Sequence, residues 1–92
     1  MNALLVFVNG ERICVAGIEY GVVGTHVGWT GSDKYGKFSL RVGGLDGRTV
    51  ERVRWLVPNV GVGDEITIRI VEVDKADPPS ERFKNNGSSG VV

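Results

Sequence analysis

Apolar and polar residues alternate along most of this chain, and this period of two is the strongest constraint on its fold. The clearest example lies in residues 65–73, where Ile66, Ile68 and Ile70 share one side and the residues between them share the other. No stretch keeps the period of about 3.6 residues that an amphipathic helix needs. The pattern therefore predicts an all-β protein whose strands place one face in a core.

Glycine-rich turns divide this pattern into six predicted strands. The chain holds 14 glycines, and glycine adopts the backbone conformations that tight turns require. The predicted strands are residues 3–8, 11–16, 22–30, 37–42, 49–57 and 65–73. Short antiparallel strands at this spacing predict a small sandwich or barrel.

The Asn-Gly pair at positions 9–10 is a strong hairpin signal, because a type I′ turn needs positive φ at both central residues. A two-residue turn there predicts that Val8 pairs with Glu11. If the pairing continues without interruption, Val6 lies opposite Ile13.

A length of 92 residues predicts one domain. The alternation ends at Asp74, and Pro78 and Pro79 follow in an extended stretch. The last residues are rich in Asn, Gly and Ser, a composition typical of linkers. We therefore expect residues 1–75 to form a single all-β domain and residues 76–92 to form an extended or disordered tail.

The charges of the chain balance, with 11 Lys and Arg residues against 11 Asp and Glu residues. A balanced chain has no overall field to attract DNA or an anionic membrane, so any electrostatic function must come from local sorting of charge. The one cysteine, Cys14, cannot form an internal disulfide. The apolar run 3–8 lacks the features of a signal peptide and is too short to span a bilayer. We therefore expect a cytoplasmic protein with no membrane partner.

Several short motifs are spread over most of residues 4–80. They are Asn9-Gly10, Cys14-Val15-Ala16-Gly17, Val27-Gly28-Trp29, Gly43-Gly44-Leu45-Asp46, Val62-Gly63-Asp64-Glu65-Ile66 and Asp77-Pro78-Pro79. In this order and spacing the chain resembles a group of small uncharacterised bacterial proteins. The resemblance implies a bacterial or phage origin and attaches no activity to the chain.

Residues suited to catalysis or metal binding are sparse. His26 is the only histidine, and a general base needs a reaction partner and usually an orienting carboxylate. One histidine and one cysteine are too few for a metal site. Cys14 lies between apolar neighbours and is expected in the core. The sequence therefore predicts no catalytic residue, no metal and no cofactor, and we expect that the protein is not an enzyme.

Arginines on outward positions of three predicted strands are the strongest candidates for a binding surface. They are Arg41, Arg52, Arg54 and Arg69. If those strands are neighbours, the guanidinium groups share one face and can hold phosphates or carboxylates by bidentate hydrogen bonds. His26, in a glycine-rich strand, and Trp29, at the edge of the face, complete the predicted ligand-binding set. The alternative is a solvated sheet face with cross-strand charge pairs.

The first strand is apolar on both faces, which a strand with one face in water does not require. Leu5 and Phe7 lie on the face opposite Val6 and Val8. Either both faces are buried inside the fold, or the second face meets another chain. We expect Leu5 and Phe7 to take part in self-association, with a symmetric homodimer as the default form.

These observations leave three functional hypotheses. The first is a non-catalytic binding module, self-associating, that acts on a protein or small-molecule partner. The second is nucleotide or single-stranded nucleic-acid binding on the arginine face, with aromatic side chains to stack a base. The third is an enzyme with a site shared between two subunits, which would bring two copies of His26 together with carboxylates.

Overall fold

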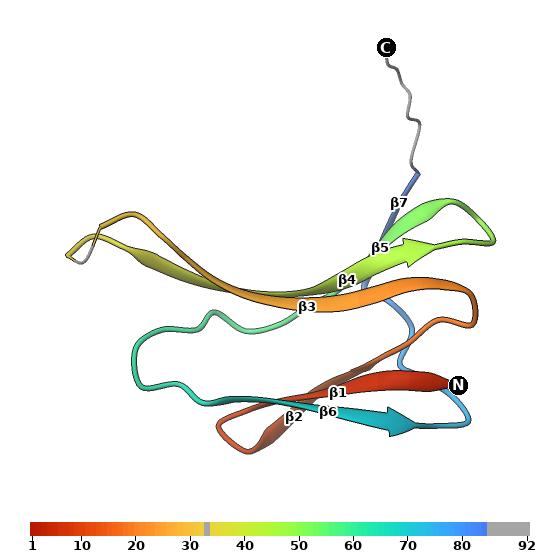
Figure 1. Cartoon of the computed structure of the whole chain (residues 1–92), viewed down its shortest axis with the longest axis horizontal. Coiled ribbons are helices and arrows are strands. Elements are labelled where there is room, and N and C mark those ends of the chain that lie inside the picture. Colours follow the sequence, from red (N-terminus) through yellow and green to blue (C-terminus); the bar gives the residue numbers. More distant parts are fainter. Residues whose placement is uncertain (33, 85–92) are drawn as a thin grey trace, which may run out of the picture.

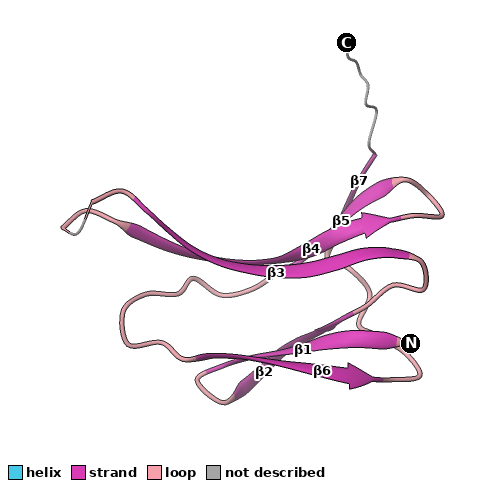
Figure 2. Cartoon of the chain, in the orientation of Figure 1, coloured by secondary structure: helices cyan, strands magenta, loops and turns pink. Residues whose placement is uncertain are grey.

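The computed structural model describes residues 1–32 and 34–84, and this part of the chain is all-β, as predicted (Figures 1 and 2). Seven strands form two antiparallel sheets. The strands are β1 (Asn2–Val8), β2 (Glu11–Ala16), β3 (Gly21–Thr30), β4 (Lys37–Asp46), β5 (Glu51–Trp55), β6 (Ile66–Glu72) and β7 (Glu81–Lys84). The three-stranded sheet has the order β2-β1-β6, and the four-stranded sheet has the order β3-β4-β5-β7.

The two sheets lie face to face and enclose one apolar core, so the fold is a sandwich rather than a barrel (Figure 1). Val6, Val8, Cys14 and Ala16 line the core from the three-stranded sheet, and Leu40, Val42, Val53 and Trp55 line it from the other. The residues from β1, β4 and β5 occupy the inward positions that the alternation predicts for their strands, whereas Cys14 and Ala16 of β2 lie on the opposite phase from the one that an uninterrupted hairpin predicts. Cys14 is buried among them, as expected.

The hairpin between β1 and β2 turns at Asn9 and Gly10, whose φ angles of 54° and 81° are those of a type I′ turn. Val8 pairs with Glu11 as predicted. The pairing of Val6 with Ile13 is wrong, because the register shifts and places Cys14 opposite Val6. A β-bulge adds one residue to one strand, and here Ile13 is the extra residue: Cys14 is buried in the core, and the half-buried Ile13 packs against it.

Asn9 also fastens the loop before β6 to this turn. Its Nδ2 donates to Asp64 Oδ1 at 3.0 Å, and its Oδ1 accepts from the Glu65 amide at 2.9 Å. The Asn9 side chain and the Gly61 amide both hydrogen-bond the carboxylate of Asp64 and lower its pKa. One asparagine thus sets the hairpin turn and the approach to β6.

The chain does not leave the fold at residue 75, and the predicted tail boundary is wrong for residues 76–84. Asp77 accepts a hydrogen bond from the Val15 amide at 2.8 Å and pairs with Arg12 at 3.0 Å. The Ser80 amide donates to the Arg54 carbonyl at 2.8 Å, and β7 then pairs with β5. The rest of the predicted tail, residues 85–92, lies outside the described residues.

The turn between β4 and β5 contains an unfavourable backbone conformation. Val50 has a φ of 58°, a left-handed value that costs a residue with a side chain roughly 1–2 kcal/mol. Its side chain is exposed, so packing offsets little of this cost. We expect Val50→Asn to raise the free energy of unfolding by about 1 kcal/mol in urea denaturation, because asparagine tolerates this region. Val62→Asn, at an exposed valine without positive φ, is the control, and a stability loss in Val50→Asn alone would contradict the expectation.

Candidate ligand-binding face

The outer face of the four-stranded sheet is hollow. The sheet bends so that its concave side points away from the three-stranded sheet (Figure 1). Outward-facing residues of all four strands line an open depression on this side. We call this surface the concave face, and its residues from β3 to β7 are Val22, Gly24, His26, Ser39, Arg41, Gly43, Leu45, Arg52, Arg54 and Phe83.

The strand register arranges these side chains in rows that cross the sheet. In the first row, Val22 lies opposite Leu45, and Leu45 lies opposite Arg52. In the second row, Gly24 and Gly43 are followed by Arg54. In the third row, His26 lies opposite Arg41. The three rows of the concave face therefore differ in character. The first begins with apolar side chains, the second begins with glycines that have no side chain, and the third pairs a histidine with an arginine.

Positive charge dominates the concave face. Among the described residues, the strand alternation directs Lys37, Arg41, Arg52 and Arg54 to this side, and Glu81 is the one carboxylate that it directs there. Glu81 pairs with Arg54 at 3.4 Å. The guanidinium of Arg54 also lies 5.2 Å from the centre of the Phe83 ring, in a cation–π contact. A chain without net charge thus carries a locally cationic surface.

Arg41 and Arg52 are exposed, and within residues 1–32 and 34–84 neither forms an ion pair. Cross-strand charge pairs, the alternative explanation for these arginines, therefore account for Arg54 alone. A guanidinium can donate two parallel hydrogen bonds to a phosphate or a carboxylate. The two unpaired arginines are the groups most available to an anionic ligand.

The structure brings together four of the six residues predicted to bind ligand: Arg41, Arg52, Arg54 and His26. It does not bring Arg69 to them, because β6 belongs to the other sheet, where Arg69 lies 5.3 Å from the ring centre of Phe7. Trp29 is also misplaced, because it shares the alternation phase of Val27 on the opposite face of β3. Strand phase predicts which side a residue faces but not which sheet its strand joins.

The residues predicted to self-associate, Leu5 and Phe7, lie on the outer face of the three-stranded sheet and are half-buried. Phe7 is partly covered by the same chain, because the guanidinium of Arg69 lies over its ring. Ala3 and Val15 on the same face are buried. Self-association through this face stays a prediction.

Sequence reasoning missed the β7 residues and the two glycines of the concave face. β7 reads Glu-Arg-Phe-Lys, and its one apolar residue gives no alternating pattern to detect. Gly24 lies in the predicted strand 22–30, but Gly43 lies outside the predicted strand 37–42, in a stretch predicted as a turn that the structure shows to be part of β4. Only the register shows that the two glycines are neighbours. The signal available in the sequence was the repeated glycine in strands that otherwise alternate cleanly.

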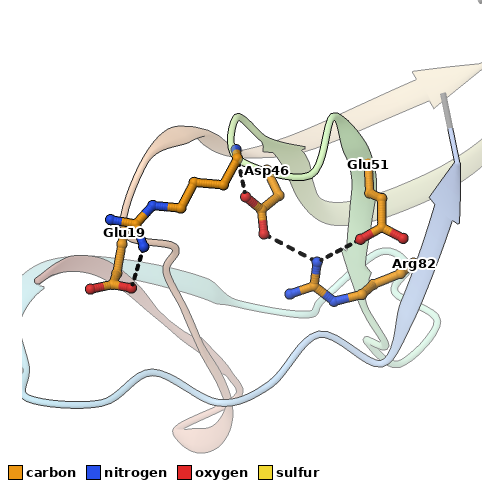
Figure 3. A network of polar contacts seen from close by, with 5 residues as sticks. Glu19, Asp46, Glu51 and Arg82 are labelled. Atoms are coloured by element: carbon orange, nitrogen blue, oxygen red, sulfur yellow. Dashed lines mark hydrogen bonds and ion pairs between the residues drawn. The ribbon is translucent and has the colours of Figure 1, made fainter.

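A polar network at one end of the sheet positions β7 (Figure 3). Arg82 on β7 donates to Asp46 Oδ2 and to Glu51 Oε1, both at 3.1 Å. Asp46 Oδ1 accepts from the Arg48 amide at 3.0 Å, and the Arg48 guanidinium reaches Glu19 at 3.4 Å. These contacts join the ends of β4 and β5 to β7, and so help to hold Phe83 and Glu81 at the concave face.

The same contacts depress the pKa of Asp46 below its usual value of 3.8, first through the Arg48 amide and then through Arg82. A depressed folded-state pKa stabilises the fold above the unfolded-state pKa, and this contribution is lost as pH falls through the folded-state value. We expect the Asp46 carboxyl to titrate below pH 3.8 when followed by carbon-detected NMR. Arg82→Ala should move that midpoint upward but not fully restore it, because the Arg48 amide remains. An Asp46 titration midpoint at or above pH 3.8 in the wild-type protein would contradict the hydrogen bonds that this carboxylate accepts from the Arg48 amide and from Arg82.

The two residues considered for chemistry lie apart. Burial raises the pKa of the Cys14 thiol, and the charge of Asp77 raises it further against the opposing effect of Arg12. His26 lies on the concave face, so the four-stranded sheet separates it from Cys14. No group of three His, Cys, Asp or Glu side chains suited to a metal ion occurs in the described part of the chain.

Comparisons of this chain with protein-family models, with curated proteins and with solved structures find no match. Residues 1–32 and 34–84 contain no helix long and apolar enough to cross a membrane.

Proposed function

We propose that this protein is a non-catalytic binding module that holds an anionic ligand on its concave face. The observation that carries this proposal is the pair Arg41 and Arg52, which share the hollow side of one sheet and have no ion-pair partner among the described residues. The chain has equal numbers of acidic and basic residues. Because the chain has no net charge, this surface is cationic only because most carboxylates lie on other surfaces. Such a local concentration of positive charge suits recognition of a negatively charged group.

The separation of Cys14 from His26 supports a binding role over a catalytic one. Covalent catalysis by a thiol needs a base within hydrogen-bond reach and a lowered thiol pKa. Here the thiol lies in the core with a raised pKa. Binding by arginines needs neither group.

We extend the proposal to a homodimer in a reducing cytoplasm. Leu5 and Phe7 would meet their copies across the outer faces of two three-stranded sheets, which leaves both concave faces open. A single buried cysteine suits a reducing compartment. Sedimentation velocity of the full chain tests the dimer, since a species of 9.9 kDa alone would overturn it.

Inorganic pyrophosphate is a simple probe for the anion site. Titration at low salt, followed by amide NMR shifts, should move signals of β4 and β5 around Arg41 and Arg52. The double variant Arg41→Glu/Arg52→Glu should lose these shifts and stay folded, because both side chains are exposed. Arg69→Glu, on the other sheet, is the matched control and should keep the shifts. Equal loss in both variants, or no shift in wild type, would remove the concave face as the binding site.

A further inference from the structure

Gly24 has no structural reason to be glycine. Its φ is not in the left-handed region, and a Cβ added there would meet no atom of residues 1–32 or 34–84 within 4 Å. Glycine inside a strand costs roughly 0.5–1 kcal/mol relative to alanine. By contrast, a Cβ at its neighbour Gly43 would lie 2.7 Å from the Val53 carbonyl oxygen, so Gly43 is required by close backbone packing. The fold needs one of these glycines and merely tolerates the other.

The absence of side chains at Gly24 and Gly43 leaves a trough across β3 and β4, in the middle of the concave face. Val22 and Leu45 form one wall, and His26 and Arg41 form the other. The two walls lie four residues apart along the strands, roughly 13 Å between their Cα rows at about 3.3 Å per residue. The trough therefore has a flat backbone floor, an apolar wall and a cationic wall.

The ring of His26 does not fill this trough. A Cβ at Gly28 would lie 2.6 Å from His26 Cε1, so the imidazole lies over Gly28, on the side away from Gly24. The position of the imidazole therefore explains why residue 28 is a glycine. Because the ring lies over Gly28, the His26 side chain stays out of the trough. The side chain of Arg54 at the end of the second row is drawn toward β7 by Glu81.

We infer that the trough holds the base of a nucleotide and that Arg41 and Arg52 hold its phosphate. This inference rests on the proposed anion site and names the class of its ligand. A planar base lying on the glycine backbone contacts the apolar Val22 and Leu45 on one side. The guanidinium of Arg41, in the opposite wall, is within reach of a phosphate and also presents a flat surface for stacking. Free nucleotides and the units of a single-stranded nucleic acid share this chemistry.

The test compares ligands that differ by one chemical part. Each of the four nucleoside 5′-monophosphates is titrated by calorimetry against the full chain, with ribose 5-phosphate as the ligand that lacks a base. We expect at least one nucleotide to bind about tenfold more tightly than ribose 5-phosphate, the gain typical of stacking one base. Gly24→Val should abolish this gain, because its side chain occupies the trough, and should leave pyrophosphate binding unchanged. The variant should fold, since valine suits a strand and space is open there.

Gly61→Val is the matched control, because a Cβ at Gly61 also meets no atom of the described part of the chain within 4 Å and its φ is not left-handed. It should keep the tenfold preference. If every nucleotide binds no more tightly than ribose 5-phosphate while pyrophosphate still binds, the inference is overturned and the proposed anion site stands. If pyrophosphate does not bind either, both are overturned.

A fluorescent ten-nucleotide single strand distinguishes the two sources of the ligand. Tighter binding than any mononucleotide, with an affinity that falls as salt rises, assigns the trough to a single-stranded nucleic acid. Equal or weaker binding than the preferred mononucleotide assigns it to a free nucleotide. Loss of either interaction in Gly24→Val, with retention in Gly61→Val, supports the base site in both cases.

Discussion

Replacement of Trp55 by alanine is expected to lower the free energy of unfolding by about 3–5 kcal/mol. Trp55 is 2% exposed and is among the largest fully buried side chains of the core. Its Nε1 donates to the Asp77 carbonyl oxygen at 2.9 Å, so the substitution also leaves that carbonyl without its partner. Small domains have total stabilities of about 5–15 kcal/mol, and a loss of this size brings this chain near its unfolding threshold. Urea denaturation followed by far-ultraviolet circular dichroism measures the change.

Trp29 provides the matched control for this prediction. It is 48% exposed near the C-terminal end of β3, and Trp29→Ala should cost less than about 1.5 kcal/mol because less of its surface is buried. Each single variant keeps one of the two tryptophans, so fluorescence reports on the same unfolding transition in both. Equal destabilisation by the two substitutions would contradict the placement of Trp55 in the core.

The Trp55 contacts also connect the core to the concave face. Trp55 and Val53 point into the core from β5, and the alternating residues Arg52 and Arg54 point to the concave face. The bond from the Trp55 indole to Asp77 fastens the segment that leads into β7. A milder substitution, Trp55→Phe, keeps most of the apolar contact but removes this bond. Arg52 and Arg54 of the site are therefore positioned by the same strand that supplies the largest core residue.

Alternation was sufficient to predict the fold class and most of the core, and the Asn-Gly pair was sufficient to predict the first hairpin turn, because each of these depends on local sequence. It also predicted correctly that Arg41, Arg52 and Arg54 face outward together. It misplaced Arg69, because the sheet to which a strand belongs depends on contacts between residues distant in the chain. A period of two carries no information about that choice.

The errors in the hairpin register and in the tail boundary also concern features that alternation does not reveal. The β-bulge near Val6 adds Ile13 to β2 and so places Cys14 opposite Val6, and turn chemistry does not determine where such a bulge falls. β7 is held by backbone pairing with β5 and by the bonds of Arg82 rather than by an apolar face. A four-residue polar strand gives no hydrophobic signal, so the segment that supplies Glu81 and Phe83 was predicted as a tail.

Replacement of Gly44 by alanine is expected to disrupt the four-stranded sheet, at a cost of about 3 kcal/mol or more. A Cβ at Gly44 would overlap the carbonyl oxygen of Val22, a backbone atom that cannot move without separating β3 from β4. A flexible side chain could turn aside, but a paired strand cannot. Urea denaturation should show the stability loss, and amide NMR signals of β3 and β4 should shift or broaden.

Gly24→Ala is the control for this last prediction, since it makes the same chemical change in the strand that pairs with β4. Space is open at Gly24, so alanine should leave the free energy of unfolding unchanged or raise it by up to about 1 kcal/mol. Similar losses at both positions would mean that Gly24 is also required by the fold, and would remove the main reason to assign it to a ligand. A large loss at Gly44 with none at Gly24 would show that the trough is open for a reason other than folding.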